Sequence, residues 1–177
     1  MFLYLAMIDS DANKSKFEIL YSKYKDLMYF TANRILRNSS DAEDVVHQAF
    51  LKVIEILDTI SSPRCHKTRA LLVTITEHKA IDLYREKQRR NVLPLAEEYI
   101  GAAPAAEIER LAERDTLAAA IASLPPRYRS VLLLRYDCGY SNAEIANILD
   151  TTEPNVRKLI QRAKEKLSAA LSEMEEP

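Results

Sequence analysis

The chain has 177 residues, 47% of them hydrophobic, with two glycines, no tryptophan and a formal net charge of −1. Long stretches of Ala, Leu, Glu, Lys and Arg exclude a sheet protein, because strands and tight hairpins need more glycine and more β-branched runs. We therefore predict an all-α fold of two small helical domains joined by a flexible linker. Cys65 and Cys138 lie far apart without CxxC spacing, which argues against a zinc or disulfide scaffold and indicates reduced thiols.

The N-terminal sequence MFLYLAMI is apolar but only eight residues long. It has no basic flank before it and no small-residue cleavage pattern after it, so we expect neither a signal peptide nor a membrane span. These features predict a cytoplasmic protein that does not insert into a membrane. Met7 is an alternative start, and the sequence leaves the choice between Met1 and Met7 open.

The charge is organised along the chain. Residues 64–92 hold eight Lys/Arg against three Asp/Glu, residues 93–126 hold two against six, and residues 127–172 hold eight against five. Two basic blocks separated by an acidic spacer predict two surfaces for a polyanion, with a connecting segment kept off it.

Apolar residues at three- and four-residue intervals predict a first helix over residues 14–37. Ser40, with Glu43 three residues later, predicts the capping box of a second helix. The stripe of this second helix comprises Val46, Phe50, Val53, Ile54 and Leu57. Acidic residues in its first turn suit the helix dipole, which by itself explains at least some of them.

Residues 58–67 contain a Ser-Ser-Pro breaker and predict an exposed basic loop. A helix is expected from Thr68 to about Arg90, ending in a basic tail. Residues 91–104 contain two prolines and Gly101 without a helical stripe, and so predict the domain boundary. Further helices are expected over residues 105–122 and from Pro126 until Gly139 stops the second one.

Residues 140–167 predict a helix-turn-helix. Ser141 and Glu144 form a capping box, residues 150–152 break the first helix, and the second begins near Glu153. The polar face of the second helix carries donor-rich side chains able to reach phosphates and base edges in a major groove: Asn155, Arg157, Lys158, Gln161 and Arg162. An ordinary amphipathic helix with a solvated polar face is the alternative for this stretch alone.

Four motifs follow in order: Asp41-Ala42-Glu43-Asp44 with Phe50-Leu51-Lys52-Val53, then Lys79-Ala80-Ile81-Asp82-Leu83-Tyr84-Arg85, then Leu124-Pro125-Pro126-Arg127-Tyr128-Arg129, and last residues 140–167. Over roughly residues 17–171 the chain resembles bacterial RNA polymerase sigma factors of the sigma-70 family, of the small extracytoplasmic-function (ECF) type. The resemblance implies a region 2 domain at residues 14–90, a linker at 91–104 and a region 4 domain at 105–171.

The resemblance also implies where the partners bind. Core RNA polymerase would dock on Asp41, Glu43, Asp44, His47 and Gln48. The minus-ten promoter element would be opened by Ser62, Arg64, His66, Lys67, Thr68 and Arg69. The minus-thirty-five element would be read by Asn155, Arg157, Lys158, Gln161 and Arg162. The chain departs from the family at His47-Gln48, at Leu71 and at Glu77-His78. An acidic Glu77 would repel a phosphate, so either this position faces away from DNA or the minus-ten contacts differ.

No glycine-rich phosphate loop, clustered metal ligands or catalytic constellation is evident, so we expect a non-enzymatic protein without cofactor, metal or small-molecule substrate. Family members of this type are commonly held by an anti-sigma factor, and we expect one here. The rival interpretation is a free-standing helix-turn-helix regulator that binds its operator without polymerase. It explains residues 140–167 equally well but not the acidic helix start, the basic loop and the linker.

Overall fold

The computed structural model describes residues 2–90 and 116–175, and every regular element within these ranges is helical. The predicted all-α fold is therefore confirmed. The chain divides into two compact units, Met1–Ala96 and Glu97–Pro177, which are described separately. Within the described ranges, no helix combines the length and the hydropathy needed to cross a bilayer.

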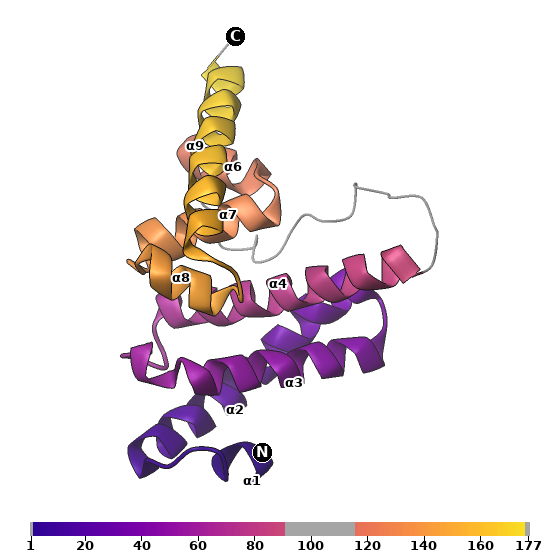
Figure 1. The fold of residues 1–177 in the computed structure, drawn as a ribbon, viewed down its shortest axis with the longest axis vertical. Coiled ribbons are helices and arrows are strands. Elements are labelled where there is room, and N and C mark those ends of the chain that lie inside the picture. The colour runs from indigo at the N-terminus through magenta and orange to yellow at the C-terminus, as the bar shows by residue number, and fades with distance from the viewer. Residues whose placement is uncertain (1, 91–115, 176–177) are drawn as a thin grey trace. The chain divides into compact units, whose positions relative to one another are not determined.

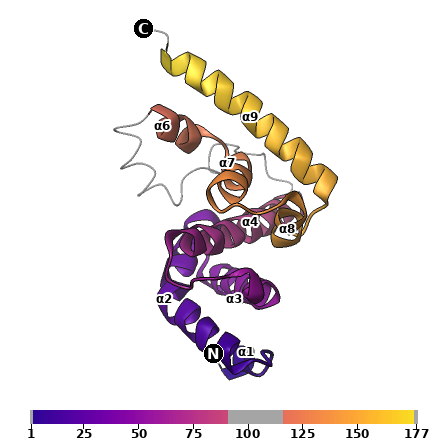
Figure 2. The same cartoon turned by 90° about the vertical axis from the view of Figure 1, so that its left-hand side faces the viewer.

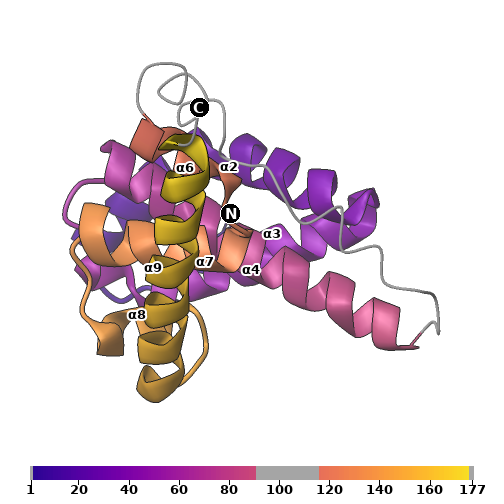
Figure 3. The ribbon, with the colours of Figure 1, turned by 90° about the horizontal axis from the view of Figure 1, so that it is seen from above.

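The first unit is a bundle of three long helices (Figure 1). They are α2 (Asp11–Leu36), α3 (Ser39–Glu55) and α4 (His66–Arg90), preceded by the short α1 (Phe2–Leu5). A 3₁₀ turn, η1 (Leu57–Thr59), follows α3. Each of the three long helices contacts the other two, and Figure 3 shows them side by side from a second direction. The largest side chains without solvent exposure include Phe17, Leu20, Met28, Phe50 and Val53.

The start of α3 differs from the prediction. The N-cap is Asn38, in extended backbone geometry, and its side-chain oxygen accepts the backbone N–H of Asp41 at 3.0 Å. The predicted cap, Ser40, is wrong, because it already lies within the first turn of α3. The preceding helix ends at Leu36, where Arg37 adopts a left-handed conformation (φ 51°) that turns the chain and leaves Asn38 as the cap.

The loop after α3 is also shorter than predicted, because α4 begins at His66 rather than Thr68. The Thr68 hydroxyl donates to the carbonyl of Ser62 at 2.6 Å and so closes the loop onto the helix. Residue 68 is buried within the fold. His66 and Lys67 consequently belong to the first turn of α4 rather than to the loop.

The second unit consists of α6 (Thr116–Ser123), α7 (Pro126–Leu132), a π-helical turn η3 (Leu133–Asp137), α8 (Asn142–Ile148) and α9 (Glu153–Glu175). The long α9 contacts α6, α7 and α8, and Figure 2 shows these shorter helices along its length. Of the helix predicted over residues 105–122, the part before residue 116 lies outside the described residues.

The helix that starts at Pro126 does not continue uniformly to Tyr136. It widens into η3, where the N–H of Cys138 bonds to the carbonyl of Leu133 at 2.9 Å, a five-residue spacing. Gly139 then takes a positive φ of 83°. Residues with a Cβ rarely adopt this conformation, so the predicted role of Gly139 as the stop is confirmed.

Candidate polymerase- and DNA-binding surfaces

The exposed side of α3 presents a compact polar row. Glu43 and His47 are four residues apart, as are Asp44 and Gln48, so the four side chains share one face of the helix. All four are exposed to solvent, whereas the opposite face of α3 packs into the bundle. We call Glu43, Asp44, His47 and Gln48 the α3 ridge. Two carboxylates, an imidazole and an amide give it an acidic but mixed character.

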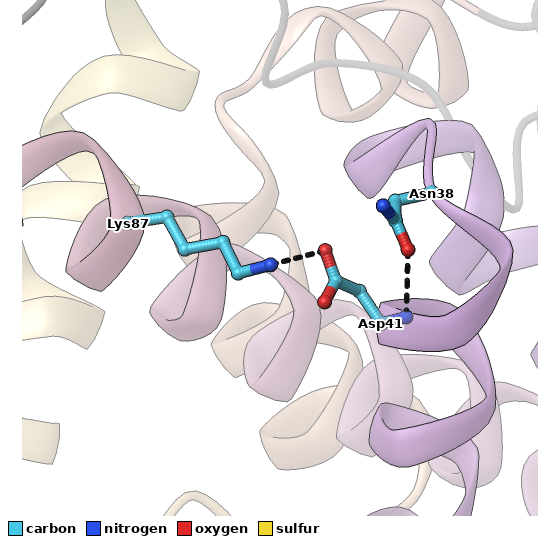
Figure 4. Close-up of polar contacts among 3 residues, drawn as sticks. All are labelled: Asn38, Asp41 and Lys87. Atoms are coloured by element: carbon cyan, nitrogen blue, oxygen red, sulfur yellow. Dashed lines mark hydrogen bonds and ion pairs between the residues drawn. The ribbon is translucent and has the colours of Figure 1, made fainter. Parts of the chain in front are cut away.

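Asp41 belongs to the same helix but is held differently (Figure 4). Its Oδ2 atom lies 2.5 Å from Nζ of Lys87 on α4, while its backbone N–H donates to Asn38. The side chain of Asp41 is 18% exposed and that of Lys87 48% exposed. Asp41 therefore ties the start of α3 to the end of α4, 46 residues further along the chain.

The basic tail of α4 is thus partly neutralised within the unit. Lys87 pairs with Asp41, and Arg90 pairs with Glu86 one turn earlier at 2.5 Å. A count of Lys and Arg in the sequence overstates the positive charge that this tail offers to a polyanion, because paired carboxylates cancel part of its field.

The structure separates the six predicted minus-ten residues into an outer and an inner group. Ser62, Arg64, His66 and Lys67 are exposed, Arg69 is half-buried and Thr68 is buried. Thr68 and Ser62 are joined by their hydrogen bond, and Sγ of Cys65 lies 3.3 Å from both the Ser62 carbonyl and the Thr68 hydroxyl. The Thr68 hydroxyl lowers the pKa of the Cys65 thiol, a change that burial partly opposes.

One cation of this surface was missed in the sequence. Lys23 of α2 is exposed, and its Nζ donates to the backbone carbonyl of Arg64 at 3.4 Å. The same Nζ lies 5.4 Å from the ring centroid of Tyr24. The two partners are 41 residues apart in the chain, and no local pattern connects them. Lys23 brings a second positive charge beside the backbone of Arg64.

Of the departures from the family pattern in α4, Leu71 and Glu77 are buried and His78 is half-buried. Only 3% of the surface of Glu77 is exposed, so this carboxylate is not presented at the surface where it would repel a phosphate. The His78 ring nitrogen Nε2 is buried without a hydrogen-bond partner. Burial lowers the pKa of His78 to about 4, and the positive charge of Arg85 adds to the effect. His78 is therefore uncharged at neutral pH.

The helix-turn-helix has the predicted capping box. The N–H of Glu144 donates to the Ser141 hydroxyl at 3.2 Å, and the Glu144 carboxylate accepts the N–H of Ser141 at 2.7 Å. These bonds lower the pKa of Glu144. The turn passes through Asp150 in a left-handed conformation (φ 49°), and the N–H of Thr151 bonds to the carbonyl of Ala146 at 2.9 Å.

All five predicted contact residues of α9 are exposed, while Val156 and Ala163 on the opposite side are fully buried. At 3.6 residues per turn the five span an arc of about 160° centred away from the core. Arg157 marks one edge of this arc and Asn155 the other, with Arg162 next to Asn155, while Lys158 and Gln161 lie nearest the middle.

Neighbours on and before α9 already hold three of these side chains. Arg157 pairs with Glu153 at 2.5 Å, and Gln161 donates to Glu165 at 3.1 Å. Asn155 donates to the hydroxyl of Thr151 at 2.8 Å. These contacts use part of the hydrogen-bonding capacity of the three side chains, and the carboxylate of Glu153 lowers the net positive charge at one edge of the helix.

Two further lysines of α9 serve the fold of the second unit. Lys164 lies 5.3 Å from the ring centroid of Tyr136 on η3, and Lys166 lies 5.8 Å from that of Tyr128 on α7. Such cation–π contacts stabilise helix packing. They were not predicted, because the sequence does not show which aromatic rings lie beside the later turns of α9.

A helical unit with a polar ridge and a unit with an exposed recognition helix define a two-domain helix-turn-helix DNA-binding protein. Residues 20–90 match the family described as Sigma-70 region 2, and residues 114–167 match Sigma-70, region 4. The chain therefore belongs to the sigma-70 family of RNA polymerase sigma factors.

Two relatives match this chain over most of their own length and of its length. The chain is 28% identical over 163 residues to the ECF RNA polymerase sigma factor SigW of Bacillus subtilis, covering 85% of this chain and 86% of SigW. It is 27% identical over 157 residues to the ECF sigma factor SigL of Mycobacterium tuberculosis, covering 88% of each. The resemblance to the ECF type is thereby confirmed.

Two solved structures are also similar. CnrH in complex with the cytosolic domain of CnrY is 27% identical, covers 88% of this chain and 87% of that chain, and gives a TM-score of 0.39. The sigma factor RpoE in complex with the anti-sigma factor NepR, from Bartonella quintana, is 17% identical, covers 86% and 94%, and gives 0.42.

The family match settles the choice between the two functions considered from the sequence. A sigma factor directs core RNA polymerase to promoters and initiates transcription, and this function requires both region 2 and region 4, which match in the expected order. A free-standing operator-binding regulator is not favoured, because it gives no reason for residues 20–90 to match region 2.

Proposed function

We propose that the two units have separate tasks. Residues 14–90, the region 2 domain, bind core polymerase and the minus-ten element, and residues 105–171, the region 4 domain, bind the minus-thirty-five element. Residues 91–104 serve as the linker between them. The observation that carries this proposal is the exposure of all five donor-rich side chains on α9 opposite a fully buried Val156 and Ala163. The recognition surface is thus available without rearrangement of the second unit.

In the first unit, the α3 ridge is the docking surface for core polymerase, and Asp41, which lies outside the ridge, supports it from the start of α3. Glu43, Asp44, His47 and Gln48 can reach a basic or hydrogen-bonding partner because they are exposed on one face. Asp41 instead stabilises the start of α3 through its pair with Lys87. Acidic groups in the ridge steer a basic partner surface and set its orientation.

The turn from Ser62 to Arg69 binds the minus-ten element. Arg64, His66 and Lys67 face solvent from a loop and the first turn of α4, where they can contact phosphates and an unstacked base. Thr68 holds the loop against α4 through Ser62 and does not contact DNA itself. Arg69, which is half-buried, supports the inner edge of this surface.

In the second unit, α9 enters the major groove at the minus-thirty-five element. Lys158 and Gln161 lie near the middle of the exposed arc and read bases, whereas Arg162, further along the helix, neutralises phosphate. Arg157 and Asn155 flank them and set the register of the helix on the duplex.

The protein acts by binding rather than by catalysis, and it works in the cytoplasm with core polymerase. An anti-sigma factor is the expected inhibitor, because a sigma factor that is held by a partner can be released on demand. Such a partner would compete for one of the surfaces described above.

Charge reversal on the α3 ridge tests the docking assignment. Asp44→Lys should weaken binding to core polymerase by about tenfold or more and reduce run-off transcription in parallel. Glu18→Lys, the same change at an exposed position of α2, is the matched control and should leave binding unchanged. Equal core affinity of the two variants would rule out the ridge as the dock.

A second comparison tests the recognition helix. Lys158→Ala should alter the preference among minus-thirty-five point mutants in transcription by the reconstituted holoenzyme. Lys164→Ala removes the same charge from the same helix at a residue that packs on Tyr136, so it should not change that preference. Unchanged preference in the Lys158 variant would show that this residue does not read a base.

A further inference from the structure

The sequence alone leaves open whether the chain starts at Met1 or at Met7. In the structure, the segment around Tyr4 packs into the first unit. Tyr4 on α1 is only 8% exposed, and Ile8, just after α1, is 6% exposed. The Tyr4 ring centroid lies 5.4 Å from that of Phe17, 5.8 Å from Tyr21 and 6.0 Å from Phe50. The ring of Tyr4 therefore covers an aromatic cluster contributed by α2 and α3. Tilted aromatic contacts of this kind stabilise beyond the apolar area that they bury.

The same ring reaches the α3 ridge. The hydroxyl of Tyr4 lies 2.6 Å from Nδ1 of His47, and the two ring centroids are 5.3 Å apart. His47 is exposed, and it is the ridge residue that Tyr4 contacts from the N-terminal segment. Residues separated by 43 positions in the chain thus meet at the edge of the ridge.

The geometry constrains the chemistry of His47. A phenol is a good donor, and burial raises the pKa of Tyr4, so its hydroxyl keeps its hydrogen at neutral pH. With Tyr4 as the donor, Nδ1 of His47 is the acceptor, and the ring hydrogen resides on Nε2. We assign Tyr4 as the donor in this contact, and the tautomer of His47 follows from that assignment. It leaves Nε2–H as a donor for an acceptor on a partner.

We propose that Tyr4 is a positioning residue for core-polymerase docking, which fixes the orientation and tautomer of His47 on the α3 ridge. The proposal rests on the ridge being the docking surface. A side chain that is ordered before binding does not lose its rotamer freedom on binding, so the fixed His47 strengthens the complex. The segment that carries Tyr4 then contributes to docking, and a chain that starts at Met7 would lack this contribution.

A double-mutant cycle on the full-length chain tests the proposal. The variants are Tyr4→Phe, His47→Ala and the two combined, with Tyr24→Phe as the matched control. Tyr24 is a buried tyrosine of α2 beside Cys65 and Arg69. Tyr4→Phe keeps the ring and its packing and removes only the hydroxyl. The measurements are the dissociation constant for core polymerase and the melting temperature.

Tyr4→Phe should weaken core binding by about 2- to 10-fold, while Tyr24→Phe should leave it unchanged. The double variant should bind no more weakly than His47→Ala alone, because the hydroxyl acts through His47. This coupling separates positioning from a general loss of stability, which would add to the effect of His47→Ala.

Three outcomes would overturn the proposal. In the first, Tyr4→Phe binds core polymerase like the wild type; in the second, its effect adds fully to that of His47→Ala. In either case Tyr4 does not act through His47. If His47→Ala and Asp44→Lys both leave core binding unchanged, the α3 ridge is not the dock, and the proposed function of this surface fails with the inference. A loss with His47→Ala but none with Tyr4→Phe refutes the inference alone.

Discussion

Asp41 and Asp44 lie in one acidic motif, yet the structure gives them separable effects. Asp41→Asn keeps the shape of the side chain but removes the charge that pairs with Lys87. The pair is partly exposed, so its loss should cost about 0.5 to 1 kcal/mol. The lost charge in the first turn of α3 costs about 0.3 to 1 kcal/mol more. The Asn38 cap remains, because it binds the backbone N–H of residue 41.

The expected total for Asp41→Asn is therefore about 1 to 2 kcal/mol in the free energy of unfolding of the first unit. For a domain of this size, each kcal/mol lowers the melting temperature by about 4 to 8 °C. Lys87→Met removes only the ion pair and keeps the aliphatic stem, so it should cost about 0.5 to 1 kcal/mol. Asp44→Asn, at a position of α3 that is exposed to solvent, should leave the melting temperature close to the wild type.

The assay combines thermal unfolding with equilibrium binding to core polymerase at a temperature where every variant is folded. Asp41→Asn should lower the melting temperature and change core affinity little, and Asp44→Asn should do the opposite. The double variant of Asp41 and Lys87 should cost less than the sum of the single changes. Full additivity, or a loss of core affinity by Asp41→Asn without any change in stability, would refute this assignment of roles.

Three further predictions concern single residues. Ser141→Ala removes the capping oxygen of α8 and should cost the second unit about 1 kcal/mol in thermal melts, with the exposed Ser168→Ala as control. Because the pKa of His78 is lowered to about 4, the unfolded chain binds more protons between pH 6.5 and 4; stability should fall by up to about 3 kcal/mol as the pH decreases through this window, and His78→Gln should flatten that dependence. Lys158→Ala should cost about 1 to 3 kcal/mol at one promoter position, whereas Arg162→Ala should weaken binding to all sequences and lower the salt slope by about one.

Local sequence patterns predicted the elements that depend on neighbouring residues. The Ser141–Glu144 capping box and the stop at Gly139 follow from residues within one turn of each other, and both are confirmed. The cap of α3 was harder, because Asn38 and Ser40 both have a suitable side chain. The left-handed Arg37 decides between them, because it ends α2 and leaves Asn38 as the cap of α3.

Contacts between distant residues could not be predicted from one sequence. The pair of Lys87 with Asp41, the contact of Tyr4 with His47 and the approach of Lys23 to Arg64 each join residues more than 40 positions apart. No periodicity encodes such pairs, because they depend on how the helices of the bundle cross. The predicted list of site residues therefore mixed side chains that face solvent with others, such as Thr68, that hold the fold together.

Ion pairs within each unit also limit how strongly the isolated chain can bind DNA. Salt-dependent affinity scales with the number of phosphates that cations neutralise, and Lys87, Arg90 and Arg157 are already paired with carboxylates. This pairing removes part of the positive charge that each unit offers to the duplex, so we expect neither unit to bind a promoter tightly alone. Linked units strengthen each other only when both engage together, and core polymerase would impose that geometry. We therefore expect weak, salt-sensitive duplex binding by the free chain and much tighter binding by the holoenzyme in the same fluorescence-anisotropy titration; tight, sequence-specific binding by the free chain at physiological salt would contradict this account.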